Sequence, residues 1–576
     1  TLAVQLSDHE LPSVIGRCNS GPVEGSTIIY NKAPLNVFKS IPYGVPPLRA
    51  DRFKDSSLVP PWTSVLNAKL WPPQCIQFNI PEYNRKAKSE SQHQSEDCLY
   101  LAIWTAKQND YAEQEKQPVV ALIHPGNFRV GSIQDVEHVG LLLSSKGFTV
   151  VAPQYRLGAF GFLLTEDGYA PGNFAVRDIQ LALAWIQRNI ASFAGDSNDV
   201  TLVGIEAGAV LAELAAIETR KTQNFHRLIL VGGSSYSSSF VANNVHRISS
   251  DTIRISEQFG VQCDMPSSRQ LVDCLRSKLF EPIVEAFANA TTVTIKPGHE
   301  RVFLGPWIDR KRLLDSQAFH LVIPTISVIS DRDSDGLLGP GFNGDGLSYS
   351  NFMAALRNMI NNQSYTSPAF VRRFILHEYV HRVGDKTDPK FLQLQYHKII
   401  NDFHCKLPTM NYLKFRLNRT SSKLHVTAVM LGKRSWLDVL HGRDQRIREV
   451  LTDIISSIVK KKGKLPPGLD PVNQWLSVPL SPINLSHLSI DMAIRNNYST
   501  KSSQETVPVK HHKYLPFRAE FAFWNNLLPD IERAVQGFVS SKCKASDCRS
   551  TVAYSGATNF RSVQANKVTV ENREEL

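Results

Sequence analysis

Strand-length apolar runs alternate with helical stretches between residues 118 and 231. The runs Val119–Ile123, Thr149–Gln154, Val200–Val203 and Leu228–Val231 are expected to be strands, and helices are expected at 141–145, at about 175–192 and from Ala207 onward. Runs that are apolar at nearly every position are typical of strands buried on both faces. Strands that alternate with helices pair in parallel through right-handed crossovers. The pattern therefore predicts an α/β fold with a large, mostly parallel central sheet flanked by helices.

Weaker patterns flank this segment. Short strands are expected at 26–44 and 99–105, and the second half mixes helices near 268–279, 351–360, 388–404 and 441–458 with strands near 322–329 and 421–430. No apolar run reaches the roughly 20 residues that cross a bilayer. Because no low-complexity tract divides the chain of 576 residues, we predict one large domain over residues 1–540. Residues 541–576 lack an amphipathic period and are interpreted as an extension or linker.

The formal net charge of +11 changes the list of expected partners. A positive surface can attract sulfated glycans or acidic proteins. The densest basic runs are 460–464 and 510–513. Charge runs usually only keep a surface hydrated, so we favour a solvated face over a glycan site for both.

Six of the eight cysteines form three pairs that are close in sequence: Cys75 with Cys98, Cys263 with Cys274, and Cys543 with Cys548. None has the spacing of a zinc site, so structural disulfides are predicted rather than metal ligands. Cys18 and Cys405 are left to pair with each other or to stay free. Sequons that predict glycosylation of a secreted chain stand at Asn289, Asn362, Asn418, Asn484 and Asn497.

Five segments in matching order and spacing resemble the carboxylesterase and cholinesterase family of α/β-hydrolases over about residues 14–535. The segments are 43–49, 95–101, 155–158, 171–174 and 523–529. The resemblance implies an α/β-hydrolase fold. It also implies disulfides Cys75–Cys98 and Cys263–Cys274 and structural ion pairs Arg52–Glu96 and Arg156–Asp178. The family often has a further cysteine just before the last segment; its absence leaves the pairing of Cys405 open.

The turn that carries the nucleophile in this fold has the pattern G-x-S-x-G. Here the strand 200–203 leads into Gly204-Ile205-Glu206-Ala207-Gly208, so Glu206 takes the place of the serine. A carboxylate has no proton for a histidine to remove, and its charge repels the oxyanion of an acyl transfer. We therefore expect no esterase activity and predict that the chain is not an enzyme.

The other catalytic positions are changed unevenly. The family's oxyanion loop, His-Gly-Gly-Gly-Phe, reads His124-Pro125-Gly126-Asn127-Phe128. Pro125 has no amide proton and Asn127 adds a side chain, so the oxyanion positions Gly126, Asn127 and Ala207 are expected to form a misshapen hole. The resemblance places Asp335 at the acid position and His511 at the histidine position.

Two interpretations of these residues stay open. In the favoured one, protonated His511 neutralises Glu206 and Asp335 in a retained polar network, because an unpaired buried carboxylate is costly. In the other, Glu206 is a carboxylate nucleophile, as Asp is in α/β-hydrolases that act on alkyl halides or epoxides, and His511 activates water. The extra methylene of Glu shifts the carboxylate by roughly 1.3–1.5 Å, which weighs against this second interpretation.

One further motif points to a cation. Residues Asp331 to Gly336 match the first half of an EF-hand loop, but Phe342 stands where the bidentate Glu is required. We therefore predict no metal site, and no cofactor.

A family fold with a substituted nucleophile resembles the cholinesterase-like adhesion proteins, a group that includes glutactin and neurotactin. This resemblance implies a secreted or extracellular location, in a basement membrane or as an ectodomain at the cell surface. The expected partners are an extracellular protein or matrix component, a sulfated glycan, and a second copy bound through helices near 388–404 and 523–537; nucleic acid is not expected. The alternative is a hydrolase or ligand-binding protein that uses the gorge leading to Glu206, with His511 and Asp335. An open, apolar gorge would favour that alternative.

Overall fold

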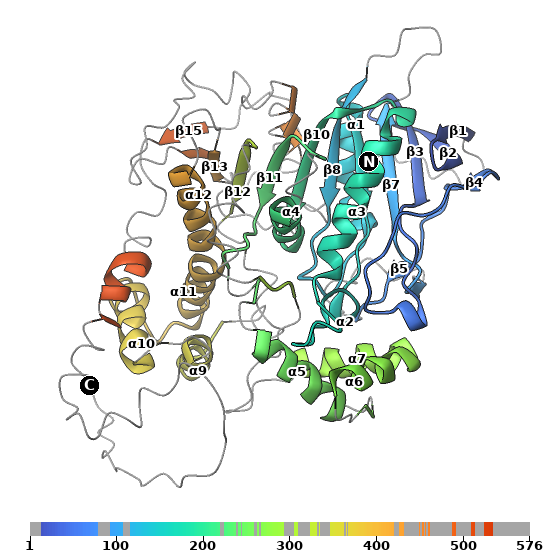
Figure 1. Ribbon diagram of the computed structural model, residues 1–576. Coiled ribbons are helices and arrows are strands. Elements are labelled where there is room, and N and C mark those ends of the chain that lie inside the picture. The colour runs from blue at the N-terminus through green and yellow to red at the C-terminus, as the bar shows by residue number, and fades with distance from the viewer. Residues whose placement is uncertain are drawn as a thin grey trace.

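A computed structural model describes residues 13–419 apart from several segments, chiefly 79–92, 107–115, 219–223, 293–304, 309–322 and 334–345. Beyond residue 419 it describes only short stretches, at 426–430, 487–490, 509–512 and 523–530 and at single positions in 449–460 and 532–533. Within these residues, one large sheet has the strand order β1-β2-β3-β7-β9-β8-β10-β11-β12-β13-β14-β15, with β4 paired to β2 (Figure 1). The strands are β1 (Ser13–Cys18), β2 (Gly21–Tyr30), β3 (Ala33–Pro42), β4 (Leu66–Asn67), β7 (Tyr100–Ala106), β8 (Gln117–Ile123), β9 (Thr149–Pro153), β10 (Gly195–Ile205), β11 (Arg227–Val231), β12 (Thr325–Ile329), β13 (Val426–Met430), β14 (His487–Ile490) and β15 (Val509–His512); β5 (Gln74–Cys75) and β6 (Gln94–Ser95) form a separate pair.

The centre of the sheet is parallel and its two ends are antiparallel. Strands β9, β8, β10, β11, β12, β13 and β14 pair in parallel. The N-terminal strands β1, β2, β3 and β7 pair antiparallel, as β15 does with β14. The predicted fold class, an α/β-hydrolase fold with a mostly parallel central sheet, is confirmed.

Both faces of the central strands are covered, which explains their continuous apolar runs. In β8, Val119, Ala121 and Ile123 belong to one core cluster, whereas Val120 and Leu122 belong to another. Helices α3 (Phe174–Asn189) and α4 (Ala207–Glu218) supply the first cluster, and α1 (Glu137–Ser145) supplies the second. A strand alternates its side chains between the two faces, so apolar residues are required at every position where both faces are buried.

The other helices gather in two groups (Figure 1). Helices α5 (Val245–Gln258), α6 (Ser268–Ser277) and α7 (Phe280–Thr292) lie together beyond one end of the strands, near α2 (Gly158–Phe162). The second group lies beside the far strands and comprises α9 (Tyr349–Asn361), α10 (Pro368–Leu376), α11 (Pro389–Asn401), α12 (Leu407–Arg419) and the π-helical turns η5 (His377–His381), η6 (Asp402–Lys406) and η7 (Phe523–Leu527). Short 3₁₀ turns are η1 (Arg49–Asp51), η2 (Ile133–Val136) and η3 (Ile190–Phe193).

The covalent and ionic links implied by the family resemblance are present. Disulfides join Cys75 to Cys98 and Cys263 to Cys274. Both guanidinium groups make paired bonds: Arg52 to Glu96 at 2.6 Å and Arg156 to Asp178 at 2.7 Å. Cys18 and Cys405 are not joined to each other by a disulfide, and Cys543 and Cys548 lie outside the described residues, as do residues 541–576 as a whole.

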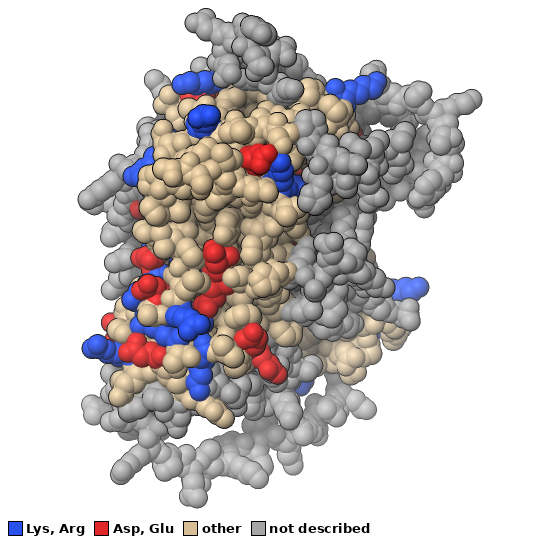
Figure 2. Space-filling model, turned by 90° about the vertical axis from the view of Figure 1, so that its right-hand side faces the viewer, with Lys and Arg blue, Asp and Glu red and all other residues tan. Residues whose placement is uncertain are grey.

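The described part of the chain was expected to hold no membrane span, and its positive charge was expected to lie mostly on solvated faces. In the part of the chain that the structure covers, no helix has the length and apolarity to cross a bilayer. Figure 2 shows Lys and Arg side chains interspersed with Asp and Glu on the face over the N-terminal strands. The excess positive charge is therefore not concentrated on this face.

Candidate active site

Glu206 stands on a sharp turn between β10 and α4. Its φ is +53°, a left-handed conformation that L-residues adopt at a cost. A Cβ on Gly204 would lie 2.2 Å from the carbonyl oxygen of Gly208, so only glycine fits there. The amide of Glu206 donates to the carbonyl of Val231 at 2.7 Å, which anchors the turn to β11. The strained turn thus projects Glu206 from the end of a central parallel strand.

The carboxylate of Glu206 lies against the oxyanion loop. Its Oε2 atom accepts hydrogen bonds from the amides of Gly126, at 2.8 Å, and Asn127, at 3.3 Å. The amide of Ala207 is a third donor to the carboxylate. The misshapen hole that we expected is therefore not found. The amides of Gly126 and Asn127 converge on Oε2, and the amide of Ala207 donates to the same carboxylate.

The loop keeps this shape because Gly126 and Asn127 both take left-handed conformations, with φ of +131° and +50°. The carbonyl of Gly126 accepts hydrogen bonds from the amides of Arg129 and Val130. A Cβ on Gly126 would lie only 1.8 Å from the carbonyl oxygen of Val130. Pro125 precedes the donors and supplies none of them, so its missing N–H does not matter.

Backbone amides hold the anion at this site. Glu206 is 6% exposed, and burial raises its pKa, while the amides of Gly126, Asn127 and Ala207 partly oppose that rise. Among the described residues no Lys or Arg forms an ion pair with Glu206. Nearby His124 is stacked on Tyr155 with ring centroids 4.2 Å apart, and burial lowers the pKa of His124 to about 4. His124 is therefore neutral at pH 7.

The backbone at the predicted histidine position is not brought to Glu206. His511 lies in β15 opposite Leu488 of β14, and its strand is five steps along the sheet from β10. At about 4.8 Å per step this puts its backbone roughly 24 Å away. The network in which His511 neutralises Glu206 is therefore not formed, because pairing with β14 holds that strand at the sheet edge. Asp335 lies outside the described residues.

Within the acidic loop around Asp335, the structure describes Asp333 but not the residues on either side of it. Asp333 is buried and its carboxylate accepts the amide proton of Ser330 at 2.9 Å, which is a turn-forming role. Asp331 and Asp335 are outside the described residues, and among the residues that are described no three His, Cys, Asp or Glu side chains form a metal-binding group. The backbones of Asn289 and Asn418 lie in α7 and α12, and the other three sequons are outside the described residues.

A second buried carboxylate was missed by the sequence analysis. Glu213 lies two turns along α4 from Glu206, with 1% exposure. Its carboxylate accepts hydrogen bonds from the amide of Ser235, at 2.9 Å, and from the Ser235 hydroxyl. Burial raises the pKa of Glu213 to about 7. The signal was available, since Glu213 is the one charged residue in the apolar stretch 207–217.

Strand β10 ends in a strained Gly-x-Glu-x-Gly turn, which faces amides from the loop after the neighbouring parallel strand β8. This arrangement places the chain in the α/β-hydrolase class. Within that class it belongs to the carboxylesterase family, whose model matches residues 12–447. It is 29% identical over 426 residues to the acylcarnitine hydrolase of Mus musculus, covering 72% of each chain. It is 29% identical over 367 residues to carboxylesterase 5A of Homo sapiens, covering 63% of this chain and 61% of the relative. Esterase FE4 of Myzus persicae is 34% identical over 274 residues, covering 47% of this chain and 46% of the relative.

These comparisons correct one prediction. From the substitution at position 206 we predicted that the chain is not an enzyme. Relatives that are named as hydrolases and esterases match most or nearly half of the chain, and they point to an enzyme. The prediction gave the substitution at one position more weight than the similarity of the chain to enzymes.

Proposed function

We propose that this chain is a hydrolase in which the carboxylate of Glu206 replaces serine as the nucleophile, acting on an electrophilic carbon such as that of an alkyl halide or epoxide. One observation carries the proposal. The buried carboxylate of Glu206 stands at the nucleophile turn, with Oε2 held by the amides of Gly126 and Asn127 and with the amide of Ala207 as a further donor to the carboxylate. Backbone amides thus fix the carboxylate at the position from which the family's nucleophile attacks.

The reaction balances without a cofactor. Oε1 attacks the substrate carbon and the carbon–halogen bond breaks, so halide leaves with the bonding pair and an ester forms on Glu206. Water then adds to the ester carbonyl carbon, and the negative charge develops on Oε2. The amides of Gly126 and Asn127 face that oxygen and stabilise the charge. Collapse of the intermediate releases the alcohol, returns the carboxylate and frees one proton.

Among the residues that the structure describes, no strong base for the second step is identified near Glu206. His511, the base that the family resemblance implies, has its backbone in β15. His124 precedes the oxyanion loop, but its pKa of about 4 makes it a weak base. We therefore expect formation of the ester to outpace its hydrolysis, so that the ester accumulates.

Mass spectrometry of the peptide containing Glu206 tests this proposal. The protein is incubated with an alkyl halide, an epoxide or an acyl ester in ¹⁸O water. An alkyl adduct on Glu206, followed by ¹⁸O in its carboxylate, is expected with the first two substrates. Glu206→Gln should abolish the adduct, and the matched control Glu213→Gln should keep it. Turnover of the acyl ester that survives Glu206→Gln and leaves no label would overturn the proposal.

A second proposal concerns recognition outside the cell, in the manner of the glutactin and neurotactin group. It is supported by the two disulfides, which are typical of chains that fold in an oxidising compartment. Helices α10 and α11 and the turn η7 expose the apolar side chains Phe370, Leu394 and Leu527, at 49, 65 and 51%. We propose that these exposed apolar side chains bind a second copy of the chain in the secreted protein.

Sedimentation measures that association directly. Leu394→Asp should shift the protein to monomer, whereas Ile29→Asp on β2, an apolar position that is 72% exposed against 65% for Leu394, should leave the dimer intact. A wild-type protein that is monomeric at micromolar concentration would contradict the proposal. Pull-down with extracellular-matrix candidates, with and without heparin, separates a specific partner from general attraction to sulfated glycans.

A further inference from the structure

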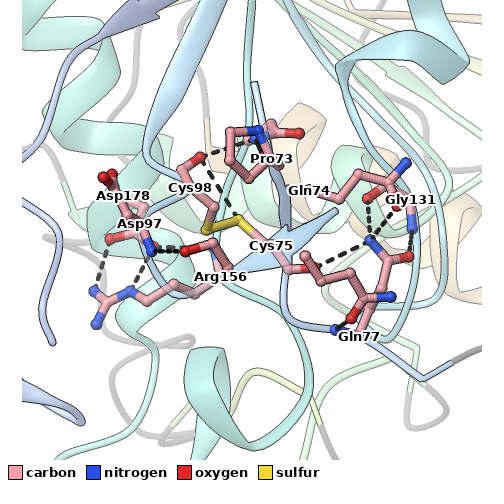
Figure 3. The surroundings of a disulfide bond; sticks show 12 residues. Pro73, Gln74, Cys75, Gln77, Asp97, Cys98, Gly131, Arg156 and Asp178 are labelled. Carbon is pink, nitrogen blue, oxygen red and sulfur yellow. Dashed lines mark hydrogen bonds and ion pairs between the residues drawn. A yellow bond between two sulfur atoms is a disulfide. The ribbon is translucent and has the colours of Figure 1, made fainter. Parts of the chain in front are cut away.

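Gln77 pairs with both backbone groups of Gly131 (Figure 3). The amide of Gly131 donates to Oε1 of Gln77 at 2.9 Å, and Nε2 of Gln77 donates to the carbonyl of Gly131 at 3.1 Å. The Gln77 side chain therefore pairs with the backbone of Gly131 as a neighbouring β-strand would. A carboxamide suits this role because it offers an acceptor and a donor side by side.

Gly131 closes the loop that holds Glu206. Its φ is +114°, and a Cβ there would lie 2.5 Å from the carbonyl oxygen of Pro125. Residues 126–130 between these contacts form a tight ring, closed by the hydrogen bond from the amide of Val130 to the carbonyl of Gly126 at 3.1 Å. A displacement of Gly131 must therefore move the amides of Gly126 and Asn127.

Gln77 is itself anchored from the opposite side. Its backbone amide donates to Oε1 of Gln94 at 3.0 Å, and Nε2 also donates to the carbonyl of Cys75 at 3.1 Å. Cys75 is tied to Cys98 by the disulfide, and β5 pairs with β6. Figure 3 shows this chain of contacts running from the disulfide to Gly131. The anchor is covalent at one end and hydrogen-bonded at the other.

We propose that Gln77 is a positioning residue that fixes Gly131 and thereby aims the amides of Gly126 and Asn127 at Oε2 of Glu206. Gln77 itself touches neither Glu206 nor a substrate. The consequence for reaction rate rests on the function proposed above. The expected effect on the pKa of Glu206 does not rest on that function, because the amides bond the carboxylate in the protein without substrate.

Titration of Glu206 in the absence of substrate is the test. Infrared difference spectra between each protein and the same protein with Glu206→Gln isolate the protonated carboxyl band of Glu206. Gln77→Ala should raise the midpoint of that band by about one pH unit, because the anion loses aligned hydrogen bonds. Gln77→Met, which keeps the length of the side chain and adds no charge, should give the same rise if Gln77→Ala fails to fold.

Gln187→Ala is the matched control. Gln187 is also half-buried and also bridges two backbone carbonyls, of Ser197 and Asn224, but it lies away from the oxyanion loop. It should lose stability without moving the Glu206 midpoint. An unmoved midpoint in a folded Gln77 variant overturns the positioning role. Absence of alkylation in the wild type would instead overturn the proposed function alone, and where alkylation occurs, Gln77→Ala should slow it on the order of tenfold.

Discussion

Oε2 of Glu206 lies 2.8 Å from the backbone nitrogen of Gly126, so the side chain at the nucleophile position fills the place where the oxyanion of a serine reaction would form. In a serine hydrolase that place receives the carbonyl oxygen of the substrate. Here an incoming carbonyl oxygen would have to displace a carboxylate. The arrangement suits a reaction in which the oxyanion forms on Glu206 itself.

Alkylation of Glu206 should increase with pH, with a midpoint above the ordinary value of 4.5. Only the ionised carboxylate attacks carbon, and burial raises the pKa of Glu206 by more than the three amides lower it. The reactive fraction therefore appears at higher pH than in a solvated glutamate. Initial rates of ester formation between pH 4 and pH 9, followed by mass spectrometry, check this. A rate that is constant over that range would contradict it.

Gly126→Ala should disrupt the oxyanion loop. The added Cβ would lie 1.8 Å from the carbonyl oxygen of Val130, and φ of +131° disfavours alanine. We expect a loss of about 2–4 kcal/mol in the free energy of unfolding by urea and a roughly 10²-fold slower alkylation. Gly147→Ala, with φ of +87° and open space around the new Cβ, should cost only ~1 kcal/mol and leave the rate unchanged. Equal effects of the two substitutions would argue against the loop as the source of the amides.

The sequence predicted the centre of the fold because local pattern and burial agree there. Val119–Ile123 and Val200–Val203 are apolar on both faces, and the two glycines around Glu206 define the turn without reference to anything distant. Pro125 misled the analysis of the oxyanion loop. The donors are the amides of residues 126, 127 and 207, and Asn127 adopts the left-handed conformation that glycine would.

Strand pairing between distant segments limited the prediction of the remaining site residues. The segment around His511 is short and basic, and nothing in it specifies that its strand pairs with residues 487–490 rather than returning to the nucleophile turn. The role of Gln77 was hidden for a similar reason, since its partner Gly131 is 54 residues away in the chain. Contacts of this kind form only when distant segments pair in the folded sheet, so local sequence patterns do not predict them.

Glu213→Gln should remove a pH-dependent loss of stability. The folded pKa of Glu213, about 7, is above the ordinary 4.5 because burial outweighs its bonds to Ser235 and the attraction of Arg416. The folded protein thus binds the proton more tightly, so its stability is full below pH 4.5 and declines as pH rises to about 7, by at most about 3 kcal/mol.

Gln keeps a donor and an acceptor for Ser235 without a charge. Urea unfolding at pH 5 and pH 8 gives the free energy of unfolding of wild type and variant. The difference between the two proteins isolates Glu213, because both contain Glu206. The variant should gain stability relative to wild type at pH 8. A difference that does not change with pH would refute the assignment.

Tyr379→Phe should destabilise the junction of the three π-helical turns η5, η6 and η7. The Tyr379 hydroxyl donates to Oδ2 of Asp402 at 3.0 Å and accepts from Nε1 of Trp524 at 2.8 Å, and all three side chains are buried. Removing the oxygen leaves two buried polar groups each short of a partner, at a cost of about 2–4 kcal/mol in urea unfolding. Tyr169→Phe removes a hydroxyl that bonds Asp273 and Arg276 near the surface, where water replaces it, and should cost less than about 0.5 kcal/mol. Should both variants lose the same stability, the Tyr379 hydroxyl would not be the link that joins these turns.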